Sequence, residues 1–402
     1  MLVLNTLKDL IDNNNLEGKK VIIRVDFNVP IIGGKIADMA RIERTIPTIK
    51  ALTDEGARVI IISHFGRPKG EYDTDLSLAP IADSLCESMG GVEVKFAVDC
   101  IGSRAIDSVD NLANGEIVVL ENLRFHKEEK ENDPDFARQL ADLADFYVND
   151  AFSCSHREHS SIVGISEYIP AYAGILLESE ISYLSSSLET PDHPVAAMVG
   201  GSKISTKIEM LENLVQKVDY LMIGGGMANT LLYAKGFKIG KSICEKDLKK
   251  TAIRIFKNAE ENNCRIMLPS DLIVAKELKT GVECEISFPD EIPKDGCIFD
   301  IGPRTVYEWA HEIEKCNTVV WNGPVGVFEV SPFDVGSISL ARVIADLTKN
   351  GGLKSVAGGG DILATLTKSG LRNHFTYVST AGGAFLEWLE GKTLPGIKIL
   401  LK

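Results

Sequence analysis

The stretch VAAMVGGSKISTK, residues 195–207, joins a short apolar run directly to a glycine-rich polar cluster. The same join occurs near the N-terminus, where residues 21–30 read VIIRVDFNVP. Short apolar runs of this kind recur between segments with helical patterns. They are Val21–Val25, Val59–Ile62, Ile117–Leu120, Phe146–Val148, Val195–Val199, Tyr220–Ile223, Arg265–Leu268, Thr318–Trp321, Lys354–Ala357 and Thr376–Val378. Continuous apolar strands that alternate with helices favour parallel sheets covered on both faces.

The length of 402 residues and the number of strands indicate two such domains. Residues Gly174–Glu189 have a helical pattern, and Pro191 and Pro194 cannot continue a regular helix. We therefore expect an α/β protein with two doubly wound, Rossmann-like parallel-sheet domains. The predicted first domain is residues 1–173, the interdomain helix is residues 174–190, and the second domain begins at residue 191.

The composition is that of a soluble globular protein with a formal net charge of -14. This charge disfavours binding to nucleic acid or to acidic membranes, because both demand a basic surface. The N-terminus lacks the pattern of a signal peptide, so we expect a cytoplasmic location. None of the eight cysteines forms a Cys-x-x-Cys pair, which predicts reduced thiols. The pair His156 and His159 has no ligand partner at zinc spacing, so we expect no metal there.

Nearly every predicted strand is followed at once by an unusual polar or glycine-rich cluster. In open α/β sheets ligands bind outside the carboxyl ends of the strands, so these clusters are candidate ligand sites. The clusters of the first half are rich in arginine, histidine, aspartate and asparagine, and include Arg24, Asp26, Asn28, Arg41, His64, Arg67, Asn122, Arg124, His156 and Arg157. Arginine binds phosphate and carboxylate groups with two parallel hydrogen bonds. We therefore expect a pocket for a small, hydroxylated, phosphorylated acid.

The clusters of the second half are rich in glycine and poor in basic residues. They are Gly200–Gly201, Gly224–Gly226, Gly323–Gly326, Gly358–Gly360 and Gly382–Gly383. Glycine lets backbone N–H groups approach a phosphate closely, and helix N-termini after such loops favour anions. Lys203 and Lys207 lie four residues apart, so on one helix they would share a face. Asp361 follows three glycines, where a carboxylate can reach a metal ion held by phosphate oxygens.

Other nucleotide-site motifs do not fit. GFKIGKS at residues 236–242 resembles a Walker A loop, but it has only three residues between its glycines and follows a helical pattern. The strings GGGMAN and GGGDIL lack the dinucleotide-binding spacing, and the protein-kinase pair of H-R-D and D-F-G is absent. A dinucleotide-dependent dehydrogenase would need G-x-G-x-x-G after a strand. A two-domain solute-binding protein would carry an export signal and needs no paired lysines.

A set of strings resembles the phosphoglycerate kinase family, in order and over essentially the whole chain. The strings are RVDFNVP, ADMARI, SHFGRPKG, ENLRF, NDAF, HREHSS, GGSKISTKI, GGGMA, LPSD, WNGPVGVFE, AGGGD and STAGGAFLEWLEGKTLPG. The resemblance implies reversible phosphoryl transfer between ATP and the carboxylate of 3-phosphoglycerate, with Mg²⁺, in glycolysis and gluconeogenesis. It also implies that residues 1–173 hold 3-phosphoglycerate, that residues 191–385 hold the nucleotide, and that residues 386–402 pack back on the first domain. We expect a monomer.

The resemblance also implies roles for individual residues. The substrate residues are Asp26, Asn28, Arg41, His64, Arg67, Arg124 and Arg157. The residues that stabilise the transferring phosphoryl group are Arg41, Lys203, Gly359 and Gly383. The nucleotide residues are Lys207, Gly225, Gly226, Asn322, Pro324, Glu329, Gly359, Gly360, Asp361 and Ile362, with Asp361 also the Mg²⁺ ligand.

Three positions depart from the family pattern. Ile362 stands where threonine is common, so a hydroxyl contact to the nucleotide is missing and Ile362→Thr is expected to tighten nucleotide binding. Ala381 replaces a glycine and is expected to restrict its turn, and Ser153 replaces another glycine. None of the three removes a charged group. The acceptor carboxyl has a pKa near 4 and is ionised at pH 7, so the reaction needs no general base.

Overall fold

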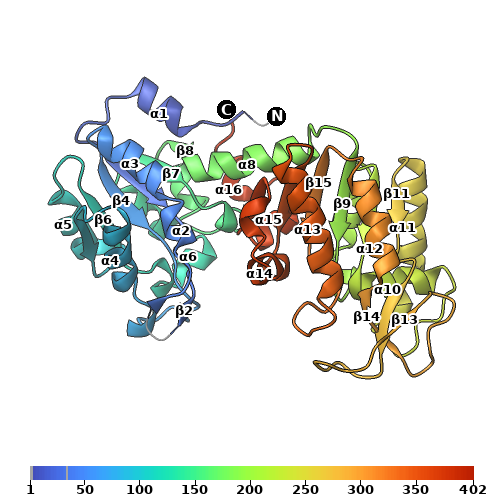
Figure 1. Cartoon of the computed structure of the whole chain (residues 1–402). Helices are drawn as coiled ribbons and strands as arrows, with labels where there is room; N and C mark the ends of the chain where they lie inside the picture. Colours follow the sequence, from blue (N-terminus) through green and yellow to red (C-terminus); the bar gives the residue numbers. More distant parts are fainter. Residues whose placement is uncertain (1–2, 33–34) are drawn as a thin grey trace. The chain divides into compact units, whose positions relative to one another are not determined.

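The computed structural model describes residues 3–32 and 35–402, which fold as two compact units (Figure 1). The N-terminal unit runs to Ile181 and also includes Thr393–Lys402. The C-terminal unit is Ser182–Lys392. Each unit is built on a six-stranded parallel sheet, which confirms the predicted fold class.

The sheet of the N-terminal unit has the strand order β5-β6-β4-β1-β7-β8. Its strands are β1 Lys20–Arg24, β4 Arg58–Ile62, β5 Val94–Ala97, β6 Ile117–Leu120, β7 Phe146–Asn149 and β8 Ala171–Ala173. A short antiparallel hairpin pairs β2 Ile31–Ile32 with β3 Lys35–Ile36. The helices of this unit are α1 Leu7–Asn13, α2 Ala40–Glu43, α3 Ile46–Asp54, α4 Ala79–Ser88, α5 Gly102–Asp110, α6 Glu128–Glu131, α7 Pro134–Ala141 and α16 Pro395–Lys398.

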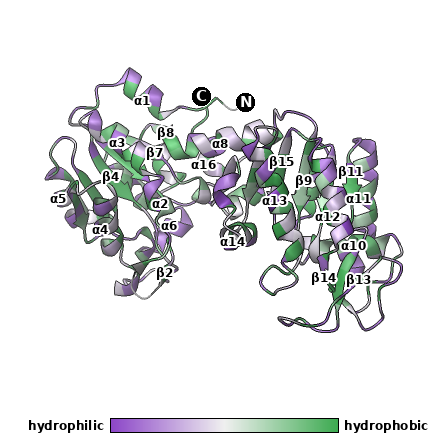
Figure 2. Cartoon of the chain, viewed as in Figure 1, coloured by the Kyte–Doolittle hydropathy of each residue, from purple (hydrophilic) through white to green (hydrophobic). Residues whose placement is uncertain are grey.

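The central strands of this sheet are mainly apolar because both faces of the sheet are buried. Val21 and Ile23 of β1 belong to a core cluster that also contains residues of α1, α3 and α4. Ile22, between them, belongs to a second cluster with residues of α5 and α7. Successive side chains of a strand point to opposite faces, so the two clusters lie on the two faces of the sheet. Figure 2 shows the strands as hydrophobic segments between helices of mixed character.

The C-terminal unit repeats this plan with the strand order β11-β10-β9-β15-β16-β17. Its strands are β9 Val195–Val199, β10 Tyr220–Ile223, β11 Arg265–Met267, β15 Thr318–Asn322, β16 Lys354–Gly358 and β17 Tyr377–Ser379. A second, antiparallel sheet contains β12 Leu272–Ala275, β13 Glu285–Ser287 and β14 Cys297–Ile301. The helices are α9 Ile208–Leu214, α10 Gly225–Ala234, α11 Lys249–Glu261, α12 Pro303–Ile313, α13 Val335–Lys349, α14 Gly360–Lys368 and α15 Gly383–Leu389.

All ten predicted apolar runs coincide with strands of the two parallel sheets, whereas several strands were not predicted. The strands β5 and β8 are short and lie at the edges of their sheet, and β5 alternates polar with apolar residues. The strands of the antiparallel sheet were also missed, because no glycine-rich cluster marks their ends. Among the described residues, no helix has both the length and the apolar character needed to cross a bilayer.

The division of the chain differs slightly from the predicted boundaries. The predicted interdomain helix is α8, Ile175–Leu188, and the division falls inside it, after Ile181. Only 393–402 groups with the N-terminal unit, where Asn149 Nδ2 donates to the Gly396 carbonyl at 3.0 Å. Residues 386–392 stay in the C-terminal unit, because Asn213 Nδ2 donates to the Leu389 carbonyl at 2.7 Å.

Candidate active site

The predicted substrate residues of the N-terminal unit follow neighbouring strands at the carboxyl edge of the sheet. Asp26 and Asn28 follow β1, and His64 and Arg67 follow β4. Arg124 lies in a 3₁₀ turn, Leu123–Phe125, directly after β6, and Arg157 follows β7. Because β6, β4, β1 and β7 are adjacent and parallel, these residues begin from one edge of the sheet.

A carboxylate organises the first part of this site. Arg41 Nη1 donates to Asp26 Oδ2 at 2.5 Å and to the Asn28 carbonyl at 3.1 Å. The Ser153 hydroxyl also donates to Asp26 Oδ2. Asn28 Oδ1 accepts a hydrogen bond from the Gly66 amide at 2.9 Å, which fixes the loop after β4. The serine that replaces the family's glycine therefore adds a contact to this carboxylate.

Beneath the site lies a buried basic layer built around Arg24, a residue that the sequence analysis listed among the polar clusters but gave no individual role. Arg24 is 1% exposed, and its Nη2 lies 3.1 Å from His64 Nδ1 while its Nε donates to Ser161 Oγ at 3.0 Å. Ser161 Oγ in turn donates to the buried Glu129 carboxylate at 2.6 Å. Burial and the positive charge of Arg24 hold the pKa of His64 well below its usual value. His64 is therefore neutral at pH 7 and can orient a polar ligand without adding charge.

Burial and neighbouring positive charges make the charged form of Arg124 unfavourable in the same layer. Its Nη1 donates to the Gly66 carbonyl at 2.7 Å, but its Nε is buried without a hydrogen-bond partner among the described residues. Burial, followed by the charges of Arg157 and Arg24, lowers the pKa of Arg124 to about 10. Arg157 is half-buried, with Nε 3.3 Å from His156 Nε2, and Arg67 is exposed. An anion among these cations would relieve their repulsion and supply the missing partner.

In the C-terminal unit, glycines bring backbone segments into close contact. A Cβ atom on Gly200 would lie 1.8 Å from the Pro324 carbonyl oxygen, so only glycine fits there. Lys207 Nζ donates to the Gly200 carbonyl at 2.7 Å and to Asn322 Oδ1 at 2.5 Å. Asn322 Nδ2 donates to the Gly358 carbonyl at 2.7 Å. Burial lowers the pKa of Lys207 to about 8. The negative charge of a nearby phosphate would stabilise the ammonium form of this lysine.

The two lysines do not share a helix face, which corrects the expectation from their spacing. Lys203 precedes a 3₁₀ turn, Ile204–Thr206, and Lys207 is the N-cap of α9 with φ −136°. The helix starts only after the second lysine, so the four-residue rule does not apply. Lys203 is exposed, and none of the hydrogen-bond acceptors in the described part of the chain holds its ammonium group. The pair therefore consists of one fixed, partly buried lysine and one exposed lysine.

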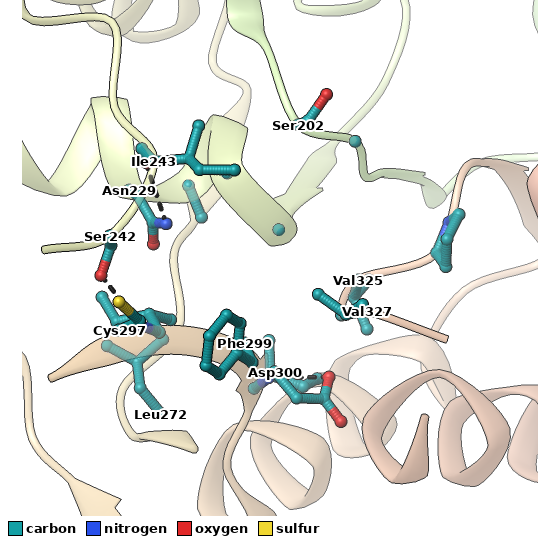
Figure 3. Close-up of a pocket in the computed structure, with 18 of the residues that line it drawn as sticks. Ser202, Asn229, Ser242, Ile243, Leu272, Cys297, Phe299, Asp300, Val325 and Val327 are labelled. Carbon is teal, nitrogen blue, oxygen red and sulfur yellow. Dashed lines mark hydrogen bonds between the residues drawn. The ribbon is translucent and has the colours of Figure 1, made fainter. Parts of the chain in front are cut away.

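A cavity of about 380 Å³ lies beside these glycine loops (Figure 3). Gly225, Gly226, Pro324, Glu329 and Asp361, five of the predicted nucleotide residues, line it. Its remaining walls are mainly apolar and come partly from the antiparallel sheet: Ile243, Leu272, Phe299, Val325 and Val327. The sequence analysis identified the WNGPVGVFE string that contains Val325 and Val327 but missed Leu272 and Phe299, whose signal was the unassigned apolar segments of β12 and β14. A largely apolar wall next to glycine loops suits a flat base attached to phosphates.

Asp300 forms part of the cavity lining and was also missed. Its oxygens accept hydrogen bonds from the Gly336 amide at 2.7 Å and the Ile301 amide at 2.8 Å. Burial raises the pKa of Asp300 to about 8, because these two bonds do not offset the loss of solvation. The Asp300 carboxyl therefore carries a proton at neutral pH and adds little negative charge to the cavity.

The start of α14 presents the remaining predicted groups. Gly359 has φ 113°, and a Cβ there would lie 2.9 Å from Asn322 Nδ2. Asp361 is exposed in the first turn, with Gly360 before it. Ile362, by contrast, is fully buried in the core cluster that contains Trp321. Its side chain cannot reach a ligand in the cavity, so only its backbone remains available, and the expected gain from Ile362→Thr does not follow.

The turn before α15 tolerates alanine at position 381. The left-handed conformation falls on Gly382, which has φ 55°, and Gly383 begins the helix. Ala381 is buried, and its amide donates to Ser379 Oγ at 3.2 Å. The expected restriction of this turn by Ala381 is therefore wrong, because another residue supplies the special backbone angle.

Comparison with known proteins gives one consistent family. A family profile described as phosphoglycerate kinase matches residues 11–392. The chain is 51% identical over 393 residues to a phosphoglycerate kinase of Methylorubrum extorquens, covering 98% of both chains. It is 50% identical over 400 residues to that of Xanthobacter flavus, covering 100% of both.

A solved structure supports the same relationship. The structure of phosphoglycerate kinase from Coxiella burnetii superposes with a TM-score of 0.89 at 43% identity, covering 99% of both chains. Matches of this identity and coverage extend over both units and both groups of site residues. The chain therefore belongs to the phosphoglycerate kinase family.

Proposed function

We propose that the N-terminal unit holds 3-phosphoglycerate and the C-terminal unit holds ATP or ADP. The reaction is that of the family: reversible phosphoryl transfer between ATP and the carboxylate of 3-phosphoglycerate, giving ADP and 1,3-bisphosphoglycerate, in glycolysis and gluconeogenesis. The observation that supports this assignment of one ligand to each unit is the contrast between the two sites. One unit gathers arginines around a carboxylate, and the other encloses an apolar cavity beside glycine loops and Lys207.

In the N-terminal unit, we assign phosphate and carboxylate binding to the arginines. Arg67, Arg124 and Arg157 supply guanidinium groups, and Arg41 is held by Asp26. Asp26 and Asn28 provide acceptors for the substrate hydroxyl, and neutral His64 provides a further polar contact. The acceptor carboxylate is the nucleophile and is already ionised, so none of these groups has to remove a proton.

In the C-terminal unit, Lys207 and the glycine loops hold the nucleotide phosphates. Backbone N–H groups near Gly225, Gly226, Gly359, Gly360 and Gly383 can approach phosphate oxygens without side-chain obstruction. The base lies against the apolar wall, and Glu329, exposed at the rim, contacts the ribose. Arg41 and Lys203 stabilise the charge on the transferring phosphoryl group.

The residues present fit a magnesium ion. Asp361 offers a hard carboxylate oxygen at the cavity, and its negative charge acts on Lys207, which places it near the phosphate-binding lysine. When bound with the nucleotide, Mg²⁺ neutralises phosphate charge. Asp361 would hold the ion, while Lys207 fixes the phosphates on the protein side.

Closure of the two units is part of this proposal. Phosphoryl transfer needs the reacting atoms within about 3–3.5 Å of each other, and the two proposed ligand sets belong to different units. Each ligand alone biases a hinge only by its differential affinity for the closed state. The helix α8, which contains the division between the units, is the natural hinge element. We also propose a cytoplasmic monomer, since each unit carries its own complete set of groups and all eight cysteines are unpaired.

The test combines an assay of the reaction with separate ligand affinities. ADP release from ATP, Mg²⁺ and 3-phosphoglycerate is measured for the wild type and for Arg157→Ala. The variant should bind 3-phosphoglycerate about 10-fold to 150-fold more weakly, because it loses charge-assisted bonds worth about 1.5–3 kcal/mol. Its affinity for ATP should be unchanged. Arg138→Ala, which removes an exposed arginine paired with Asp135 in the same unit, is the matched control and should behave as wild type. A loss of ATP affinity in Arg157→Ala would reverse the assignment of the units.

A further inference from the structure

A second cavity in the C-terminal unit, of about 440 Å³, is lined by four lysines. Lys238, Lys246, Lys249 and Lys294 surround it together with Tyr233. Most of these residues come from the segment 233–249. This segment includes GFKIGKS, which resembles a Walker A loop but lacks the spacing of one. This cavity shares the helix α10 with the proposed nucleotide cavity but has no lining residue in common with it.

The fold brings the lysines together through a close contact between two loops. Gly240 has φ 56°, and a Cβ there would lie 2.3 Å from the Gly296 carbonyl oxygen. The Lys241 amide donates to that same carbonyl at 2.8 Å. This contact places the loop that carries Lys238 against the loop that carries Lys294. The bodies of Tyr233 and Phe237 pack on an apolar cluster with Leu272 and Ile292, so the cavity has a fixed floor.

The positive charge around this cavity is not neutralised by the protein. In the described ranges, none of the four lysines has a carboxylate oxygen within 4.0 Å. Lys246 and Lys249 each lie over the Tyr233 ring, 5.8 Å from its centroid. Two carboxylates flank Lys246 in sequence: Glu245 is engaged by the Ser205 amide and hydroxyl, and Asp247 lies in the 3₁₀ turn Lys246–Leu248. Four like charges are thus gathered in one concavity of a protein whose net charge is -14.

The helix α11 begins with one of these lysines, although positive side chains are unfavourable at a helix N-terminus. Lys249 is the first residue of a 13-residue helix whose first turn has no acidic residue and whose N-cap makes no side-chain hydrogen bond. Cations are unfavourable at a helix N-terminus, even though the 3₁₀ turn Lys246–Leu248 precedes α11 and the Lys249 amide donates to the Lys246 carbonyl. A bound anion would offset both the lysine repulsion and the unfavourable helix start.

We propose that this lysine-lined cavity binds a small multivalent phosphate anion. Lysine acts on phosphate as a strongly hydrated point charge, so several lysines around one concavity favour a compact ligand of high charge. Lys246 and Lys249 each lie 5.8 Å from the Tyr233 ring centroid, so an aromatic base stacked on this ring would compete with both ammonium groups. The site therefore differs from a nucleotide site in that the phosphate groups carry the recognition.

The experiment is a titration of the full-length protein with inorganic pyrophosphate, followed by the backbone amide NMR signals of residues 233–249 and 290–296. Residue-by-residue signals separate this cavity from the two proposed catalytic sites. We expect saturable shifts in these segments, weaker binding of orthophosphate, and a loss of affinity as KCl rises. Lys246→Gln combined with Lys249→Gln should weaken pyrophosphate binding here by at least about tenfold, because two charge-assisted contacts are lost.

The matched control combines Lys250→Gln with Lys279→Gln. Both lysines are exposed and lie outside the cavity lining, and the pair changes the net charge by the same amount. The control should bind pyrophosphate as the wild type does, and catalytic activity in both double variants shows that each is folded. Equal weakening in the two double variants would mean that only net charge matters and would overturn the site. Unshifted signals in the wild type, or binding to phosphoinositide vesicles without binding to free pyrophosphate, would overturn it as well.

Discussion

The two units share one sheet plan but prepare for anions in opposite ways. The N-terminal unit uses charged side chains: Arg24 is buried with hydrogen-bond partners, whereas Arg124 is buried with no partner for its Nε among the described residues. The C-terminal unit uses backbone shape, because Gly200 and its neighbours let chain segments approach more closely than any side chain allows. In the first unit the energetic cost lies in electrostatic repulsion, and in the second it lies in the entropy and conformational freedom of glycine.

This difference determines what each site can recognise. Guanidinium groups fix the number and direction of the hydrogen bonds to a small acid, which suits a ligand that must be told apart from other metabolites. Backbone loops beside an apolar cavity suit a ligand with a flat base and a phosphate chain. One fold thus supports both halves of a transfer reaction, because the clusters at the strand ends vary while the sheets do not.

The sharpest test of the comparison substitutes glycine in each site. Gly200→Ala should destabilise the C-terminal unit by more than about 4 kcal/mol, since its Cβ would overlap the Pro324 backbone, which cannot move aside. Gly66→Ala, in the N-terminal site, meets only the flexible end of the Leu76 side chain and should cost about 1–2 kcal/mol. Gly352→Ala is the control, because the nearest atom lies 3.8 Å away. Denaturant unfolding measures all three, and equal costs at positions 200 and 66 would contradict the contrast.

The two lysines of the C-terminal unit should separate catalysis from binding. Lys203→Ala should lower kcat by about 10²–10³, as expected for the loss of one group that stabilises the transition state, with little change in stability or in KM. Lys207→Ala should instead weaken nucleotide binding, because it removes the contacts to the Gly200 carbonyl and Asn322. Steady-state kinetics and ATP titrations distinguish these outcomes. A Lys203→Ala enzyme with wild-type kcat would remove Lys203 from the mechanism.

The contributions of His159 and Asp300 to stability should change with pH in opposite directions. Burial lowers the pKa of His159 to about 3, so below pH 6.5 the unfolded chain binds a proton that the folded N-terminal unit does not. Stability from this group falls as the pH falls. The pKa of Asp300 is raised to about 8, so the folded C-terminal unit holds a proton that the unfolded chain has released above pH 3.8. Stability from Asp300 therefore falls as the pH rises toward 8, by at most about 1.4 kcal/mol per pH unit.

Tryptophan fluorescence can follow the C-terminal unit alone, because Trp309, Trp321 and Trp388 all lie in it. Between pH 5 and 8, the stability seen by this probe should decline in the wild type and decline less in Asp300→Asn. Asp346→Asn, at an exposed position on α13, is the charge-matched control and should keep the wild-type slope. Identical slopes in all three proteins would mean that Asp300 is ionised in the folded state.

The sequence was sufficient to predict the elements whose apolar runs are buried on both faces, and it identified the polar clusters at their ends. It could not predict the apolar wall of the proposed nucleotide cavity, because Leu272 and Phe299 belong to an antiparallel sheet without a terminal cluster. The four-residue spacing of Lys203 and Lys207 also led to a wrong prediction that they share a helix face. Helix periodicity applies only within a helix, and α9 begins after Lys207. The role of Arg24 needed the structure, because a strand residue gives no sign of which neighbours it meets in the interior.

The smallest effect is expected at Ile362, where the residue type and the residue position suggest different outcomes. The Ile362 side chain is fully buried in the core and does not line the cavity. Ile362→Thr therefore buries a hydroxyl group and removes apolar contacts with neighbours such as Leu366. We expect a loss of about 1–2 kcal/mol in stability and an unchanged affinity for ATP. Ile362→Val is the control that shortens the side chain without a hydroxyl, and it should cost about 0.5–1.5 kcal/mol.

Denaturant unfolding and ATP titration of both variants decide between the two accounts. If the hydroxyl reached a nucleotide phosphate, Ile362→Thr would bind ATP more tightly than Ile362→Val, by up to about tenfold for one hydrogen bond. The buried position of Ile362 excludes that contact, because its side chain belongs to the core cluster with Trp321 and Leu340. Equal ATP affinities, with the threonine variant the less stable of the two, would show that position 362 supports α14 from beneath. The direct phosphate contacts of this helix would then come from its backbone, with Asp361 acting through Mg²⁺, in keeping with a unit that recognises its ligand mainly through backbone shape.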